Sequence, residues 1–300
     1  MDSAPVMNIE AAPDLVGESH EVIAPERQTV PLVFASPHSG SDYPAAFVAA
    51  SRLDPVTLRK SEDSFVDELF SAAPELGAPL IRALFPRAYV DPNREPFELD
   101  QSMFTDQLPA YANTGSPRVA VGLGTIARVV ANGADIYRGK LMAAEALQRI
   151  RRYYWPYHRS LQSLVEQTRI AFGSCLLIDC HSMPSVGGPM DRDTGRNRLD
   201  FILGDCHGTA CAPAVVEAIE GLLRDLGYHV ARNAPYSGGF VTRHYGKPKA
   251  GTHCLQIEIN RSLYMDETRI ARGPGMLHLA RDLRAMIAML TGLNWAETPA

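Results

Sequence analysis

The 300-residue sequence lacks any apolar run that approaches the roughly 18 residues needed to span a bilayer. It also lacks the basic segment followed by an apolar segment that is typical of a secretory signal peptide. Its five cysteines are an odd number without paired spacing, so no disulfide framework is predicted. We therefore expect a protein of the reducing cytoplasm.

Positive charge is also in short supply. The chain has 29 Lys and Arg against 34 Asp and Glu, which gives a formal net charge of −5. This balance argues against nucleic acid or an anionic membrane as the main partner. Dense metal-binding motifs such as His-Glu-x-x-His and Cys-x-x-Cys are missing as well. A metal site would therefore have to be assembled from residues that lie far apart in the sequence.

Hydrophobic residues make up 46% of the chain, enough for the core of one large α/β domain. Short apolar runs predict buried strands at residues 31–35, 79–85, 88–90, 175–178, 200–203, 229–231 and 254–259. Helical spacing of apolar residues predicts helices at residues 65–73, 139–154, 213–226 and 279–290. Pro156 is expected to interrupt the second of these, and a further helical stretch follows it to about residue 170. The loops are predicted at 100–138, 185–198 and 236–251.

This alternation predicts an α/β fold with three layers, α/β/α, and a mostly parallel or mixed central sheet. No internal repeat and no linker divides the chain. We expect one catalytic domain at residues 28–300, preceded by an N-terminal arm at residues 1–27 that is rich in Ala, Pro and Glu.

The stretch Leu176–Ser185 is the most informative part of the sequence. Its apolar run reads as a buried strand that is followed by Asp179 and His181. Polar residues at the carboxyl end of such a strand lie where open α/β sheets place their ligand sites. His181 can ligate a metal while a nearby carboxylate orients its ring, or it can simply cap the strand.

Other predicted strands end in the same way. Their polar residues are His38, then Asn93 with Arg94, and finally Glu258 with Asn260 and Arg261. If these ends meet at one edge of the sheet, His38 and His181 supply two of the three protein ligands that a catalytic zinc commonly takes. The third ligand is then a carboxylate from Glu62 or Asp63. His207 also follows a predicted strand and competes with His181.

Several blocks of sequence resemble the N-formylglutamate amidohydrolase family. They are Ser-Pro-His-Ser-Gly-Ser-Asp-Tyr-Pro (36–44), Glu-Asp-Ser-Phe-Val-Asp-Glu-Leu-Phe (62–70), Val-Asp-Pro-Asn-Arg-Glu (90–95), Ile-Asp-Cys-His-Ser-Met-Pro (178–184), Tyr-Ser-Gly-Gly-Phe-Val-Thr-Arg (236–243) and Gln-Ile-Glu-Ile-Asn-Arg (256–261). The family is similar to the zinc carboxypeptidase and aspartoacylase group. The resemblance implies a phosphorylase/hydrolase-like fold with one Zn²⁺ per chain, or another divalent ion in its place.

The resemblance also implies roles for individual residues. His38 and His181 resemble the metal histidines, Asn93 and Arg94 the pair that grips a substrate carboxylate, and Glu258 the catalytic carboxylate. The wider group has its carboxylate ligand three residues after the first histidine, where this chain has Ser41. The ligand must therefore come from elsewhere, and we favour Asp63 over Glu62.

The implied reaction is hydrolysis of N-formyl-L-glutamate to L-glutamate and formate, a step of histidine degradation. Because this substrate has two carboxylates, we expect a second arginine beside Arg94, either Arg128 or Arg243, and close backbone approach at Gly239. Glu258 would act as general base and then general acid, unless it is a structural carboxylate paired with Arg261. The alternatives are a zinc amidohydrolase of another N-acyl amino acid or small peptide, and an inactive relative that only binds.

Overall fold

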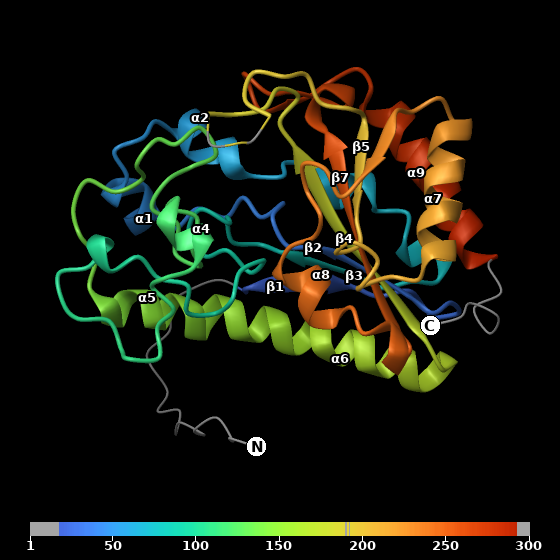
Figure 1. Cartoon of the computed structure of the whole chain (residues 1–300), viewed down its shortest axis with the longest axis horizontal. Coiled ribbons are helices and arrows are strands. Elements are labelled where there is room, and N and C mark those ends of the chain that lie inside the picture. Colours follow the sequence, from blue (N-terminus) through green and yellow to red (C-terminus); the bar gives the residue numbers. More distant parts are fainter. Residues whose placement is uncertain (1–17, 190, 192, 293–300) are drawn as a thin grey trace.

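The computed structural model of the chain describes residues 18–189, 191 and 193–292, and a seven-stranded sheet forms its centre (Figure 1). The strands are β1 (His20–Ile23), β2 (Leu32–Ser36), β3 (Leu80–Ala83), β4 (Cys175–Met183), β5 (Phe201–Gly204), β6 (Val230–Arg232) and β7 (Thr252–Asn260). Their order in the sheet is β1-β3-β2-β4-β7-β5-β6. The pairs from β3 to β7 are parallel, whereas β1 is antiparallel to β3 and β5 is antiparallel to β7. The sheet is therefore mixed.

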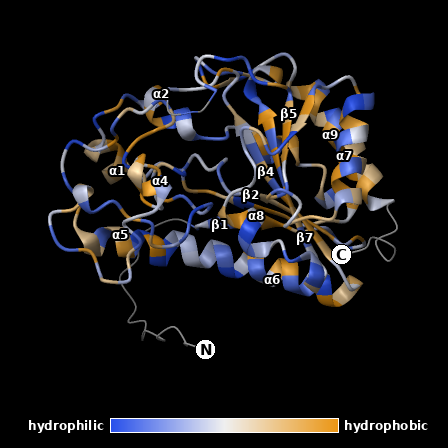
Figure 2. Ribbon diagram, in the orientation of Figure 1, coloured by the Kyte–Doolittle hydropathy of each residue, from blue (hydrophilic) through white to orange (hydrophobic). Residues whose placement is uncertain are grey.

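Helices cover both faces of this sheet, so the predicted three-layer α/β/α fold is confirmed (Figure 1). The long helices are α6 (Trp155–Phe172), α7 (Pro213–Asp225) and α9 (Met276–Thr291). Successive strand residues point to opposite faces. Leu32 and Phe34 of β2 pack in the core beneath α7 and α9, whereas Val33 and Ala35 pack in the core with α6. Figure 2 shows the hydrophobic residues concentrated along the strands and the helix surfaces that face them.

The remaining elements are short. They are α1 (Ala45–Ala50), α2 (Pro55–Leu58), η1 (Arg59–Ser61), α3 (Val66–Leu69), η2 (Pro74–Leu76), η3 (Gln101–Met103), α4 (Pro117–Ala120), α5 (Ala143–Arg149), η4 (Ile150–Tyr154), α8 (Phe240–Tyr245), η5 (Pro248–Ala250), η6 (Arg261–Leu263), β8 (Met265–Asp266) and β9 (Ala271–Arg272). None of the helices in the described part of the chain is long and apolar enough to cross a membrane.

The helix around Pro156 continues where the sequence predicted an interruption. It begins at Ala143 rather than Gly139, and α5, η4 and α6 follow one another without a break. Proline has no N–H to donate and its ring crowds the preceding turn. Here η4 is a π-helical turn, in which the Trp155 N–H bonds to the carbonyl of Ile150. The wider turn and the position of Pro156 at the start of α6 explain why the helix is not broken.

Other boundaries also differ from prediction. Residues 88–90 form a turn rather than a strand, because the N–H groups of Tyr89 and Val90 both bond to the carbonyl of Pro86. The predicted loop at 236–251 contains the helices α8 and η5. Strand β4 runs on to Met183, so Asp179 and His181 lie within the strand rather than beyond it.

The predicted N-terminal arm falls largely outside the described residues, which begin at residue 18. Its last part contains β1, an edge strand that pairs with β3. The single domain at residues 28–300 stays a prediction, since residues 293–300 are also outside the described part.

Candidate active site

Three buried side chains from separate segments converge at the carboxyl end of β2 and β4. His38 follows β2, Asp63 follows η1, and His181 lies in β4. One ligand atom from each lies within 4.8 Å of the other two. The Oδ2 atom of Asp63 is 3.3 Å from Nδ1 of His38 and 3.0 Å from Nδ1 of His181. A backbone bond from the Asp63 N–H to the carbonyl of His38 (3.0 Å) ties the two loops together.

The far nitrogen of each ring lies within hydrogen-bond distance of a second carboxylate. Nε2 of His38 lies 2.8 Å from Oδ1 of Asp91, and Nε2 of His181 lies 2.9 Å from Oδ1 of Asp179. Such outer carboxylates fix the ring orientation and the tautomer of metal-ligating histidines, leaving the other nitrogen free to bind. Both histidines therefore direct Nδ1 towards Asp63.

The donor set fits a divalent metal ion. Nδ1 of His38 is buried and has no hydrogen-bond partner within the described residues. Buried nitrogens are rarely left unpaired, and a cation placed between the three side chains would satisfy this one. Burial raises the pKa of Asp63, but its interactions with the imidazoles of His181 and His38 outweigh burial and hold the pKa well below its usual range. The carboxylate is thus ionised, as a metal ligand must be.

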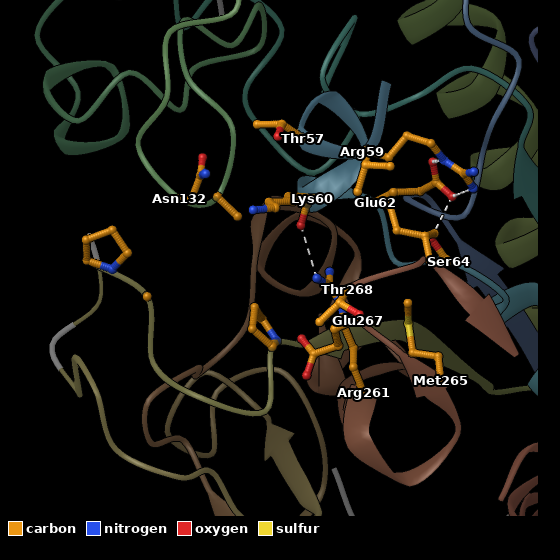
Figure 3. Close-up of a pocket in the computed structure, with 16 residues that line it drawn as sticks. Thr57, Arg59, Lys60, Glu62, Ser64, Asn132, Arg261, Met265, Glu267 and Thr268 are labelled. Carbon is orange, nitrogen blue, oxygen red and sulfur yellow. Dashed lines mark hydrogen bonds and ion pairs between the residues drawn. The ribbon is translucent and has the colours of Figure 1, made fainter. Parts of the chain in front are cut away.

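Asp63, and not Glu62, faces the histidines. Arg261 donates from Nη2 to Oδ1 of Asp63 (3.0 Å), and the Ser182 hydroxyl donates to the same oxygen (3.3 Å), so Oδ2 remains for a metal. Glu62 instead accepts bonds from Arg59 and from Ser64 (2.7 Å each) and lines a different cavity, as Figure 3 shows.

The cavity that Glu62 lines has a volume of about 380 Å³ and no histidine in its wall. It is larger than the cavity that opens on His38 and His181. Arg261 connects it to the histidine cluster, because its Nη1 donates to the Lys60 carbonyl in this cavity (Figure 3). Its Nη2 donates to Oδ1 of Asp63. Size alone would favour this cavity as the active site, but the convergent ligand atoms of His38, Asp63 and His181 do not lie in its wall.

The cavity that opens on the histidines has a volume of about 140 Å³. Its lining residues are His38, Arg87, Asn93, Arg94, Arg118, His181, Pro235, Tyr236, Ser237, Gly238, Gly239, Gln256 and Glu258. It is small, polar and rich in arginine, so it suits a small anionic ligand.

Glu258 lies beside His181 because β4 and β7 pair in parallel register, with these two residues as direct neighbours. The side-chain amide of Gln256 donates to Oε1 of Glu258 (2.9 Å). Burial raises the pKa of Glu258 to about 7. A carboxylate with a pKa near neutrality accepts a proton and returns it with similar ease. No ion pair joins Glu258 to Arg261 among the described residues, since Arg261 pairs with Asp63.

The backbone of residues 92–94 is held by η4 and α6. The Tyr154 hydroxyl donates to the Arg94 carbonyl (2.8 Å), and Nε2 of His158 donates to the Pro92 carbonyl (2.8 Å). Tyr154 and His158 are four residues apart and so lie on one side of the helix. The segment is a loop rather than the predicted strand end, and these two bonds fix its backbone.

The side chain of Asn93 packs against Gly239, where the sequence predicted close approach of a ligand. A Cβ atom on Gly239 would lie 2.3 Å from the side-chain oxygen and nitrogen of Asn93. The Asn93 oxygen accepts a bond from the Val241 N–H (2.8 Å) at the start of α8. Glycine is required here because Asn93 packs directly against the backbone, and Gly239 also lines the cavity.

The two predicted second arginines are not in the cavity wall. Arg128 forms ion pairs with Asp100 (3.1 Å) and Asp135 (3.0 Å) and lines another cavity, so the structure does not bring it to the histidines. Arg243 is exposed and donates to the Gly238 carbonyl (3.3 Å) outside the cavity. His207 is exposed and does not line the cavity either.

Sequence reasoning missed Arg87 and Arg118, which do line the cavity. Arg87 donates to Oδ2 of Asp91 (2.7 Å), the carboxylate that also orients His38. Its position four residues before Asp91 is a signal that could have been noticed. Arg118 carries no such signal, because it lies in a long loop region without periodicity.

Comparison with known proteins connects this geometry with a chemistry. A family model described as N-formylglutamate amidohydrolase matches residues 30–265. The N-formylglutamate deformylase of Pseudomonas aeruginosa is 32% identical over 252 residues, which cover 82% of this chain and 86% of that protein. The N-formylglutamate deformylase of Pseudomonas putida is 28% identical over 251 residues, covering 83% and 86%.

Solved structures agree. The crystal structure of N-formylglutamate amidohydrolase from Ralstonia eutropha JMP134 superposes with a TM-score of 0.82 at 37% identity, covering 91% of this chain and 97% of that one. A protein of Agrobacterium tumefaciens shares the fold, with a TM-score of 0.65 at 19% identity over 91% of this chain and 95% of that one.

The ligand assignment predicts a contrast between neighbouring carboxylates. Asp63→Asn should lower the affinity for Zn²⁺ by more than ~100-fold, because it neutralises a ligand that faces both histidines. Glu62→Gln should leave the affinity nearly unchanged, because Glu62 points to Arg59 and Ser64. Metal content and competition with a chelator measure the difference. A larger loss in Glu62→Gln would move the third ligand to Glu62.

His38→Ala and His181→Ala should also purify with little metal, since each removes one of the converging nitrogens. His207→Ala is the matched control, because His207 is exposed and lies outside the cavity. Metal content near one equivalent in both His38→Ala and His181→Ala would contradict the site, provided that circular dichroism shows folded protein.

Proposed function

Because the chain belongs to the N-formylglutamate amidohydrolase family, we propose that it hydrolyses N-formyl-L-glutamate to L-glutamate and formate in the cavity above His38, Asp63 and His181. Its relatives are hydrolases of a formyl amide bond, and so is this chain. The observation that carries the proposal is the placement of Glu258, a carboxylate with a pKa of about 7, directly beside a set of convergent metal-ligand atoms.

We assign the metal to zinc, held by Nδ1 of His38, Nδ1 of His181 and Oδ2 of Asp63. Two imidazole nitrogens and one carboxylate oxygen are a typical catalytic zinc set, although other divalent ions accept the same ligands. A bound ion of this kind supplies Lewis acidity, which polarises the formyl carbonyl and makes water a stronger acid.

Glu258 moves the proton. It takes a proton from the attacking water and delivers it to the amide nitrogen, so that the amine departs neutral and formic acid remains, which then loses its proton to become formate. The Gln256 amide holds one oxygen of Glu258, which fixes the direction of the carboxylate. Burial keeps bulk water from competing for that proton.

Arg87 lies where negative charge develops. Its guanidinium is fixed by Asp91 (2.7 Å), and its pKa is raised by the nearby carboxylates of Asp91, Asp63 and Glu258, which outweigh the effect of burial. A fixed cation in a site sheltered from water stabilises an oxyanion without reorganising. We assign Arg87 to the oxygen of the formyl carbonyl as it becomes negative.

Asn93 and Arg94 bind one substrate carboxylate. Arg94 uses Nε for the Leu123 carbonyl (2.8 Å) and Nη1 for the Asn93 carbonyl (2.8 Å), and its Nη2 is 3.7 Å from Asp91. The guanidinium is therefore rigid while further N–H groups remain for a ligand. Gly239 allows Asn93 to reach the same cavity.

The substrate is tested by formate and amine release from a panel of N-formyl, N-acetyl and N-succinyl amino acids, with metal-free and zinc-loaded protein. We expect N-formyl-L-glutamate to be the best substrate and the metal-free protein to be inactive until zinc is restored. Preference for an acetyl or succinyl compound would favour another N-acyl amino acid. Binding without turnover of any compound would indicate an inactive relative.

Glu258→Gln should keep the zinc and the fold but lower kcat by ~10²- to 10⁴-fold, the usual contribution of a general acid–base group. Glu267→Gln is the control, because Glu267 lines the larger cavity and accepts a bond from the Ser185 N–H (3.1 Å), away from the histidines. A decrease of less than about tenfold would mean that another group is the base.

The pH profile supplies a second readout for Glu258. A protonated carboxyl accepts no proton, so kcat/KM of the parent enzyme should fall as the pH decreases through the pKa of Glu258. A bound cation lowers that pKa, which places the acid limb at or below pH 7. An acid limb that is unchanged in the residual activity of Glu258→Gln would contradict the assignment.

Gly239→Ala should lower kcat/KM by about 10- to 100-fold without loss of zinc. The added Cβ displaces the Asn93 side chain, and small misplacements in an active site have effects of this size. Gly115→Ala is a matched control, because a Cβ there meets no atom within 4 Å. Normal kinetics in Gly239→Ala would remove Asn93 from substrate binding.

A further inference from the structure

Arg118 differs from Arg87 and Arg94, the other arginines in the wall of the cavity that opens on the histidines, because these two pair with Asp91. It lies in α4, in the loop region between β3 and α5, and its side chain is exposed. Within residues 18–189, 191 and 193–292 its guanidinium has no hydrogen bond or ion pair, although it lines the same cavity as Glu258 and His181. Most arginines of this chain that lie in a cavity wall have a partner, so this one is available to a ligand.

The cavity has more positive than negative charge. Arg87 and Arg94 share one carboxylate, Asp91, which also orients His38. Burial together with the positive charges of Arg118 and Arg87 outweighs Asp91 and lowers the pKa of Arg94 to about 10. Arginines crowded in this way repel one another, and an anion between them relieves the repulsion. One substrate carboxylate satisfies Arg94 and leaves Arg118 for another.

The backbone around Arg118 is fixed even though its side chain is free. The Ser116 hydroxyl accepts a bond from the Val119 N–H (3.1 Å) and caps α4, and the Arg118 carbonyl accepts a bond from the Leu123 N–H (2.8 Å). The Leu123 carbonyl in turn accepts a bond from Nε of Arg94 (2.8 Å). The loop that carries Arg118 is therefore attached to Arg94.

The close fit of Gly124 sets the register of the same loop. A Cβ atom there would lie 2.2 Å from the Glu98 carbonyl oxygen. The neighbouring Thr125 N–H donates to that carbonyl (2.8 Å), and the Thr125 carbonyl accepts from the Asp91 N–H (2.8 Å). The positions of Arg94 and Arg118 relative to each other are thus built into the fold.

We propose that Arg118 binds the γ-carboxylate of the substrate at the mouth of the cavity while Arg94 binds the α-carboxylate inside it. The assignment rests on the proposed function. Among the two carboxylates of N-formylglutamate, the α-carboxylate is nearer to the amide nitrogen that receives the proton from Glu258. It therefore reaches the buried arginine, Arg94, which is 8% exposed. The γ-carboxylate extends away from the reacting bond and reaches the exposed arginine.

This assignment replaces Arg128 and Arg243 as the source of charge selectivity. Arg128 is already neutralised by Asp100 and Asp135, and Arg243 lies outside the cavity. A guanidinium without an internal partner gains more from a substrate carboxylate than one that must first release its own.

The test compares kcat/KM for three compounds. N-formyl-L-glutamate has both carboxylates, N-formyl-L-glutamine has an amide in place of the γ-carboxylate, and N-formyl-L-isoglutamine has an amide in place of the α-carboxylate. Arg118→Ala should lower kcat/KM for N-formyl-L-glutamate by ~10- to 100-fold, the range for a lost bond to a charged group. The loss should appear mainly in KM, because Arg118 does not touch the reacting atoms. Activity on N-formyl-L-glutamine should change little, so the preference for glutamate over glutamine collapses.

Matched variants sharpen the result. Arg118→Lys should restore part of the preference, since it keeps the charge but not the forked geometry. Arg243→Ala should retain the parental preference. Both the parent and Arg118→Ala should discriminate against N-formyl-L-isoglutamine, because Arg94 is intact in each. Zinc content and thermal melting check that Arg118→Ala is otherwise native.

Two outcomes overturn the assignment of Arg118. In the first, Arg118→Ala keeps the parental ratio of kcat/KM for N-formyl-L-glutamate to kcat/KM for N-formyl-L-glutamine. In the second, that ratio falls in Arg243→Ala instead. Failure of the proposed function is a separate result, in which the parent enzyme with zinc releases no formate from N-formyl-L-glutamate.

Discussion

The site depends on charge compensation in a buried position. Asp63 is almost fully inaccessible, yet it is ionised because two imidazoles face one of its oxygens and Arg261 with Ser182 holds the other. An isolated buried carboxylate would take up a proton, since removing a charge from water costs several kcal/mol. Here the carboxylate stays negative, and so it is ready to bind a metal ion.

The sheet provides the rigidity that this arrangement needs. His181 and Glu258 are neighbours in register on β4 and β7, the two nine-residue central strands. Slippage of either strand by one residue would send its own side chain to the opposite face and separate the pair. The proposed proton-transfer group and the proposed metal ligand are thereby held at a fixed separation. The residues that we propose to bind substrate, Asn93 and Arg94, lie in a loop that η4 and α8 fix.

The cavity separates chemistry from selectivity. The reacting groups are buried beneath Arg87 and Arg94, which are held by Asp91, and the unpartnered Arg118 lies further out. Fixed inner cations stabilise charge that develops during the reaction, because they do not have to move. In our proposal, Arg118, an outer cation without a partner among the described residues, binds the carboxylate of the substrate side chain.

The sequence by itself determined the layered α/β fold, since short apolar runs and helical periods alternate along the chain and each buries one predictable face. His38, His181 and Glu258 could be chosen because they follow or end such runs within family-like blocks. Only the tertiary structure shows that Asp63 and not Glu62 faces the histidines, and that Arg118 lines the cavity whereas Arg128 and Arg243 do not. Neighbouring carboxylates and loop arginines look equivalent in sequence. They are distinguished by partners distant along the chain, such as Arg261 for Asp63 and Asp100 for Arg128, which no local pattern specifies.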